Sequence, residues 1–196
     1  MELTLTFIRG AFTHPGREGR FLGRIDAPLH PDGLAQLSEK ARSGRYPTAD
    51  AVFSSPLMRC TESARVIYPY SNTIVTELLA DFDYGEFSGK AYGEIIAHEQ
   101  FGNWAKADTL RAFPGGEAPY IFIGRCLEAL REVIAYMQQG RLASASIVTH
   151  QAVIRAILQR NCLPHCVYGD YKLDYGGGIT VECDAHTTAL KMLERF

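Results

Sequence analysis

The chain has 196 residues, 46% of them hydrophobic and 21% charged, which suits one α/β domain over residues 1–196 with a sizeable buried core. Its formal net charge of -2 gives no electrostatic case for nucleic acid or a membrane surface as a partner, so any anion site must be local. No run approaches the roughly 20 apolar residues of a membrane span, and five scattered cysteines favour reduced thiols, so we expect a cytoplasmic protein.

The first predicted element is a buried strand over residues 3–8 that runs into a functional loop ending at Thr13. Its apolar residues alternate with threonines, which are equally compatible with a strand. Arg9 ends the hydrophobic run and is followed by Gly10 and Ala11. Because an open α/β sheet places ligand-binding groups at the carboxyl ends of its strands, the pattern predicts a functional site at Arg9.

The rest of the chain alternates between strand and helix patterns, which is typical of an α/β fold. The first predicted elements are a helix opened by Pro31 and ended by Ser43-Gly44, a strand over 51–53, a helix with Arg59 in its first turn, a strand over 74–76 and a helix over 92–104. They are followed by a Pro-Gly-Gly turn at 114–116, a long helix with Glu117 in its first turn that runs through Met137, a strand and a helix that meet at His150, and one more strand or tail from Leu190.

Two polar side chains beyond Arg9 also follow predicted strands, Arg59 and His150. A phosphoryl group carries up to two charges and three acceptor oxygens, which the planar guanidinium fork of an arginine matches. A helix begins directly after His150, so the backbone N–H groups of Gln151 and Ala152 can face an anion. Taken alone, each side chain has a plainer interpretation, a solvated arginine and a structural histidine.

Several ordered stretches together resemble the histidine phosphatase superfamily, the phosphoglycerate mutase-like proteins, over essentially the whole chain. Residues 9–13 resemble the Arg-His-Gly-x-Thr that ends the family's first strand, and residues 54–64, SSPLMRCTESA, resemble its "SSPL.R..ETA" block. The other stretches are 19–29, 79–89, 113–118, 146–155 and 173–183, the last of which resembles the family's final strand. The resemblance implies a three-layer α/β/α sandwich with a mostly parallel central sheet, helices on both faces, and a lid-type insertion around residues 90–115.

The resemblance also implies roles for individual residues. Arg9, Arg59 and His150 would hold the phosphoryl oxygens, with Gln151 completing the phosphate-binding set, and His150 would stabilise charge in the transition state. Asp81 falls on the position of the family's proton donor, with a side chain one methylene shorter than the family's acid. We expect no cofactor and no metal, because the Cys162–Cys166 cluster lacks a second ligand pair at a convincing spacing.

One position departs from the family pattern in a way that bears on activity. The family transfers a phosphoryl group to the imidazole of the first histidine, and Gly10 stands at that position. The neighbouring blocks keep the family spacing, so no gap recovers a histidine. The surroundings differ as well, at Ala11, Phe12, Gly16 and Gln151. We therefore expect a protein that binds a phosphorylated small molecule or inorganic phosphate, with phosphatase activity weak or lost.

Two other functions remain open at this stage. An active phosphomonoesterase, similar to the alpha-ribazole phosphatases, would need another nucleophile, for which His14 is the nearby imidazole, or a directly attacking water. A regulatory or scaffold protein would use Phe12, Tyr92 and Trp104 around the pocket mouth as a binding surface. The substrate, the pathway and whether the chain forms a homo-oligomer are not readable from the sequence.

Overall fold

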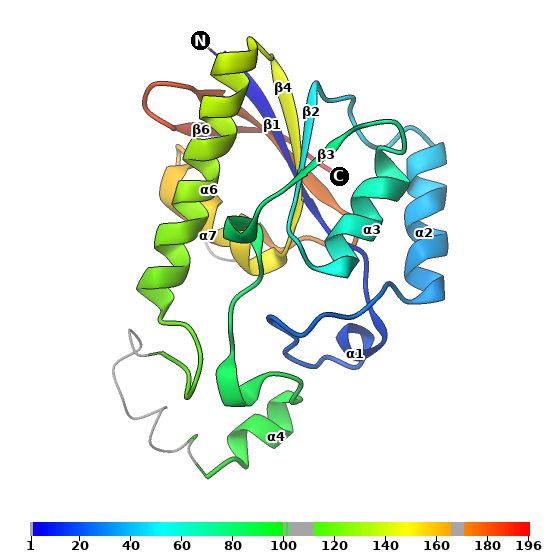
Figure 1. Cartoon of the computed structure of the whole chain (residues 1–196), viewed down its shortest axis with the longest axis vertical. Coiled ribbons are helices and arrows are strands. Elements are labelled where there is room, and N and C mark those ends of the chain that lie inside the picture. Colours follow the sequence, from blue (N-terminus) through cyan, green and yellow to red (C-terminus); the bar gives the residue numbers. More distant parts are fainter. Residues whose placement is uncertain (1, 100, 102–111, 166–170) are drawn as a thin grey trace.

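The structure is a computed structural model that describes residues 2–99, 101, 112–165 and 171–196 (Figure 1). Its centre is a six-stranded sheet with the strand order β3-β2-β4-β1-β5-β6. The strands are β1 (Glu2–Arg9), β2 (Ala51–Ser54), β3 (Thr73–Val75), β4 (Ser144–Thr149), β5 (Gly178–Asp184) and β6 (Leu190–Arg195). β1 pairs with β4 in parallel, as β2 does with β3 and β4, whereas β5 runs antiparallel to both β1 and β6.

Helices cover both faces of the sheet. They are α1 (His14–Arg17), α2 (Pro31–Arg42), α3 (Met58–Ile67), α4 (Tyr92–Ile96), α6 (Pro119–Gly140) and α7 (Gln151–Asn161), with short 3-10 turns η1 (Glu77–Leu79) and η2 (Gly85–Phe87). Figure 1 shows α6 and α7 on one side of the sheet and α2 and α3 on the other. The predicted α/β/α sandwich with helices on both faces is confirmed.

Two hydrophobic clusters account for the layers. Leu3, Leu5 and Phe7 of β1 pack in a cluster with the buried faces of α6 and α7, whereas Ile8 packs in a second cluster with α2 and α3. Successive side chains of a strand point to opposite faces of a sheet, so β1 serves both clusters. Along α6, Ala129, Leu130, Val133, Ile134 and Met137 are buried at helical spacing. No described helix is both long and apolar enough to cross a membrane.

Two predictions on the segment that follows η2 are wrong. The helix expected over 92–104 is interrupted, because α4 ends at Ile96 and the amide of His98 bonds to the carbonyl of Ile95 in a tighter turn. Of the α4 residues only Ile95 is buried, so little packing supports a longer helix. Glu117 lies outside the long helix, since Ala118 is the N-cap of α6. Residues 102–111, and with them Trp104, lie outside the described ranges.

The parallel strands β1, β2 and β4 end at the same edge of the sheet, where each gives way to a loop or a helix. Arg9 is the last residue of β1, Ser54 ends β2, and Thr149 ends β4 directly before α7. The sequence-predicted polar residues therefore meet at this edge, as expected for a parallel sheet.

Candidate functional site

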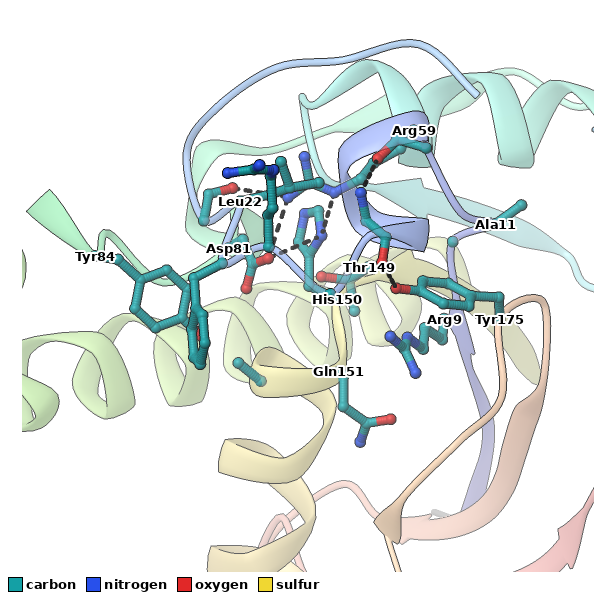
Figure 2. Close-up of a pocket in the computed structure, with 18 of the residues that line it drawn as sticks. Arg9, Ala11, Leu22, Arg59, Asp81, Tyr84, Thr149, His150, Gln151 and Tyr175 are labelled. Atoms are coloured by element: carbon teal, nitrogen blue, oxygen red, sulfur yellow. Dashed lines mark hydrogen bonds and ion pairs between the residues drawn. The ribbon is translucent and has the colours of Figure 1, made fainter. Parts of the chain in front are cut away.

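A cavity of about 320 Å³ opens at this edge, and every residue that the sequence analysis assigned to the site lines it (Figure 2). The six are Arg9, Gly10, Arg59, Asp81, His150 and Gln151. They come from β1, the loop after it, α3, the loop after η1, and the junction of β4 with α7. The fold thus brings together residues that lie up to 142 positions apart in the sequence, from Arg9 to Gln151.

Arg59 is buried and held by the protein through every nitrogen of its guanidinium. Nη1 donates to the carbonyl of Ile25 at 2.9 Å and Nη2 to that of Gly23 at 2.7 Å. Nη2 also donates to Asp81 Oδ2 at 3.1 Å, and Nε donates to His150 Nδ1 at 3.2 Å. Figure 2 shows Arg59, Asp81 and His150 joined in this way. The guanidinium is therefore fixed in place before any ligand arrives.

The contacts of His150 define its tautomer. An arginine only donates, so Nδ1 must accept the hydrogen bond from Arg59, and the ring proton lies on Nε2. Nε2 then donates to Ser55 Oγ at 2.7 Å. Burial lowers the pKa of His150 well below its usual range, and the positive charge of Arg59 lowers it further. The imidazole is neutral, with both nitrogens engaged by protein groups.

Asp81 is the carboxyl side chain among the described residues that line the cavity. Its Oδ2 accepts from Arg59 and lies 3.6 Å from His150 Nδ1, while its Oδ1 accepts from the backbone amide of Phe82 at 2.9 Å. Burial raises the pKa of the Asp81 carboxyl, and the nearby Arg59 charge opposes part of that rise. A carboxyl with a raised pKa in a pocket is suited to donate a proton.

Arg9 and Gln151 both hold the segment that leads to β5. Arg9 Nη1 donates to the carbonyl of Leu173 at 2.6 Å, and its guanidinium stacks 3.8 Å from the ring centre of Tyr175 (Figure 2). The Gln151 side chain donates to the carbonyl of Tyr171 at 2.6 Å and accepts from the amide of Leu173 at 2.8 Å. The amide side chain of Gln151 thus clamps this backbone segment, and its backbone N–H lies at the start of α7, where N–H groups have no acceptor within the helix.

Little room remains for a side chain at Gly10. A Cβ at this position would lie 3.1 Å from the carbonyl oxygen of Arg59 and 3.2 Å from Cys60 Sγ. Cys60 is fully buried, and burial raises the pKa of its thiol to about 12. Cys60 Sγ also lies 3.6 Å from His150 Nε2. The Cys60 thiol is therefore protonated and fills the space beside Gly10, and it is not an activated nucleophile.

The cavity is electropositive. Among the lining residues in the described ranges, the arginines are Arg9, Arg20, Arg59 and Arg155, whereas Asp81 is the carboxylate. Arg20 is balanced by its ion pairs with Glu18 and Glu94 at 2.9 Å each. The amino end of α7 adds partial positive charge at the same place. The arrangement favours an anion, and in particular one with several acceptor oxygens.

The described residues invoked by the alternative functions, His14, Phe12 and Tyr92, do not line the cavity. His14 is exposed, contacts His30 with tilted rings whose centroids are 4.1 Å apart, and is not among the cavity-lining residues. Phe12 packs against His30 and Tyr175, while Tyr92 is exposed on α4. In the described ranges no group of His, Cys, Asp or Glu side chains is arranged to hold a metal ion.

Sequence reasoning missed several residues that shape the site. Ser55 bonds to His150, Gly23 bonds to Arg59, and Tyr84, Arg155 and Tyr175 line the cavity. All five belong to stretches that resemble the family pattern, so their place near the site was indicated. The groups that these residues contact were not indicated by the sequence, because the contacts join distant parts of the chain.

Comparison with known proteins agrees with the geometry. A sequence model of the histidine phosphatase superfamily (branch 1) matches residues 5–194. A candidate phosphoserine phosphatase 2 of Hydrogenobacter thermophilus is 30% identical over 158 residues, covering 79% of this chain and 76% of the relative. Phosphoserine phosphatase 1 of the same organism is 26% identical over 157 residues, covering 78% and 73%.

Solved structures share the fold over nearly the full length. The alpha-ribazole phosphatase from Shigella flexneri superposes with a TM-score of 0.80 at 20% identity, covering 97% of this chain and 96% of that one. The mycobacterial glucosyl-3-phosphoglycerate phosphatase superposes with a TM-score of 0.79 at 17% identity, covering 98% and 97%. At this level of identity the likeness shows the fold alone.

Proposed function

Because the chain belongs to the histidine phosphatase superfamily, we propose that it binds a phosphorylated small molecule, or inorganic phosphate, in the cavity at the ends of β1 and β4, with phosphatase activity weak or lost. The observation that carries the proposal is the glycine at position 10, where a Cβ would lie 3.1 Å from backbone and 3.2 Å from a buried thiol. The family resemblance puts the nucleophilic histidine at this position.

The binding part of the proposal rests on the charges of the cavity. Arg9 keeps donors beyond the one used for Leu173, and the first amides of α7 point along the helix axis toward the pocket. Asp81 and Gly23 hold Arg59 Nη2, whereas Nη1 uses one of its two N–H groups for the carbonyl of Ile25. The guanidinium therefore keeps its orientation on Asp81 while its second Nη1 N–H remains for a phosphate oxygen.

The catalytic part rests on the absence of an activated nucleophile among the described residues that surround Gly10. Cys60 is protonated, Ser55 is fully buried, and His14 lies outside the cavity lining. His150 has both nitrogens engaged, so it is not free to act as a base without breaking its bond to Arg59 or Ser55. Loss of the covalent step commonly removes several orders of magnitude of rate.

A second function, hydrolysis by a directly attacking water, is favoured by one observation. Asp81 lines the cavity with a raised pKa, which is what the protonation of a leaving group requires. The names of the relatives in Hydrogenobacter thermophilus make phosphoserine the first substrate to try.

Phosphate binding and turnover are tested together. The melting temperature is measured with inorganic phosphate, vanadate and phosphoserine, and phosphate release is measured from phosphoserine and p-nitrophenyl phosphate. The wild type is compared with Arg9→Ala and with Arg42→Ala, an exposed arginine paired with Glu39, as a control. At a ligand concentration of 100 Kd the stabilisation is about 2.7 kcal/mol, and we expect Arg9→Ala alone to abolish it.

The outcomes separate the two functions. Ligand stabilisation that depends on Arg9, with phosphate release at background, supports the binding function. Rapid release that is lost in Arg9→Ala supports water attack and overturns the inactive interpretation. No stabilisation by any of the three ligands, and no turnover, overturns both.

A further inference from the structure

A buried ion pair lies directly behind Asp81. Arg125 of α6 and Glu117, which precedes α6, form a two-pronged contact, with Nε to Oε1 at 2.7 Å and Nη2 to Oε2 at 2.9 Å. The two side chains are 12% and 10% exposed, so water screens the pair weakly. Neither residue lines the cavity. The pair therefore influences the geometry of the site only through the residues to which it is hydrogen-bonded.

The remaining N–H groups of Arg125 bond to the backbone before and at Asp81. Nη1 donates to the carbonyls of Leu78 at 3.0 Å and Ala80 at 2.6 Å, and Nη2 donates to the carbonyl of Asp81 at 2.8 Å. With Glu117, these acceptors use every N–H of the guanidinium. Residues 80–84 belong to no strand or helix, so ladder hydrogen bonds do not set their path.

Glu117 fixes the chain on the other side of Asp81. Its backbone amide donates to the carbonyl of Asp83 at 3.0 Å, and its Oε2 accepts from the amide of Asp83 at 3.5 Å. The backbone is thus held at residues 78, 80, 81 and 83 by one buried pair. A lysine at position 125 would keep the charge without the planar fork that reaches three carbonyls.

We infer that Arg125 is a positioning residue for Asp81: with Glu117 it fixes the backbone that places the Asp81 carboxylate on Arg59 and beside His150. The predicted effect of Arg125 on ligand binding rests on the proposed function. Its role in placing the Asp81 carboxylate does not depend on that function. If this role holds, the orientation of Arg59 in the phosphate site depends on a residue that touches neither phosphate nor Arg59.

The first test measures phosphate affinity in a double-mutant cycle. Arg125→Met should weaken the binding of inorganic phosphate about five-fold, and the same change in an Asp81→Asn background should have an effect of less than about two-fold. Arg125→Lys should not restore affinity, since it lacks the fork. Arg131→Met is the control, because Arg131 lies on the exposed face of α6 and pairs with Glu128.

A second readout needs no ligand. The imidazole resonances of His150, identified by their loss in His150→Gln, report the groups around its ring at a fixed pH. The groups in contact with the ring are Arg59, Asp81, Ser55 and Cys60. The charges of Arg9, Arg24 and Arg125 act on it from further away. We expect the resonances to move in Arg125→Met and Arg125→Lys and to stay in place in Arg131→Met. A variant that only lowers the melting temperature would leave them unchanged.

The outcomes keep the inference separate from the proposed function. If the wild type binds no phosphate but the His150 resonances move in both Arg125 variants, the proposed function fails and the positioning role stands. If Arg125→Lys restores wild-type affinity and resonances, the effect is one of charge and the inference is overturned. If Arg125→Met does not fold, Glu117→Gln replaces it, and unchanged His150 resonances in that variant would overturn the inference as well.

Discussion

A histidine placed at position 10 should not restore a working nucleophile unless the neighbouring thiol is also removed. The Cβ of Gly10→His would lie 3.1 Å from the carbonyl oxygen of Arg59, which accepts a hydrogen bond from Ser63 inside α3 and has little freedom to move. It would lie 3.2 Å from Cys60 Sγ, which is fully buried. Overpacking of this kind costs about 1–3 kcal/mol.

Two smaller contributions adjust this figure. Gly10 does not have a positive φ, so a histidine there meets no backbone strain and gains about 0.4–1 kcal/mol from a less flexible unfolded chain. Cys60→Ala alone removes one buried heavy atom, which costs about 0.5–1.5 kcal/mol. In the double variant the space left by the sulfur accepts the imidazole, so we expect a favourable coupling of about 1–2 kcal/mol.

The measurement is urea unfolding of the wild type, Gly10→His, Cys60→Ala and the double variant, with release of phosphate from phosphoserine assayed on each. Gly124→His serves as a control, since Gly124 is exposed on α6 and a Cβ there meets nothing within 4 Å. Hydrolysis should be highest in the double variant. If Gly10→His is as stable as the wild type and the coupling is near zero, the position is open and this reasoning is wrong.

Three further predictions follow from single contacts. Gly23→Ala places a Cβ against the carbonyl oxygen of Phe82 at a φ of +53°, so it should lower the free energy of unfolding. The loss should exceed that of Gly44→Ala, where φ is +71° but nothing lies within 4 Å of a Cβ; urea unfolding of both variants decides this. Ser55→Ala leaves the Nε2–H of His150 buried without its Ser55 acceptor and should lower the free energy of unfolding by about 1–3 kcal/mol. No loss is expected if a water molecule takes the place of the hydroxyl. The pKa of His150 is lower in the native chain than its usual 6.5, so below pH 6.5 the unfolded chain binds more protons than the native chain. The free energy of unfolding should therefore fall as the pH drops below about 6.5, by up to about 1.4 kcal/mol per pH unit. His150→Gln should reduce the difference in the free energy of unfolding measured between pH 7.5 and pH 5.

The sequence predicted most of the fold and the meeting of Arg9, Arg59 and His150, because each lies at or after the end of one of the parallel strands β1, β2 and β4, and such strands end at a common edge. It did not predict which protein groups these side chains contact. The bonds of Arg59 to Gly23 and Ile25 depend on how a loop folds over α3, which no local pattern encodes.

Other misses have the same origin. The sequence pattern placed the backbone N–H of Gln151 toward an anion, and this stays a prediction; it indicated no partner for the side-chain amide, which bonds to the segment at Tyr171 and Leu173. Glu117 was assigned to a helix first turn, whereas it pairs with Arg125 across the start of α6. In each case the residue type was informative, but its partner lies where tertiary packing brings another part of the chain.

The strand order has a consequence for how this protein is made. β1 is synthesised before its sheet neighbours β4 and β5, which lie more than 130 residues later in the chain, as Thr4 pairs with Ser144 and with Glu182. Until those strands emerge, β1 has no sheet partner and its apolar residues Leu3, Leu5 and Phe7 stay uncovered; non-local pairing of this kind is slow and open to aggregation. Arg9 can form its bond to Leu173 only after that same late segment has been made.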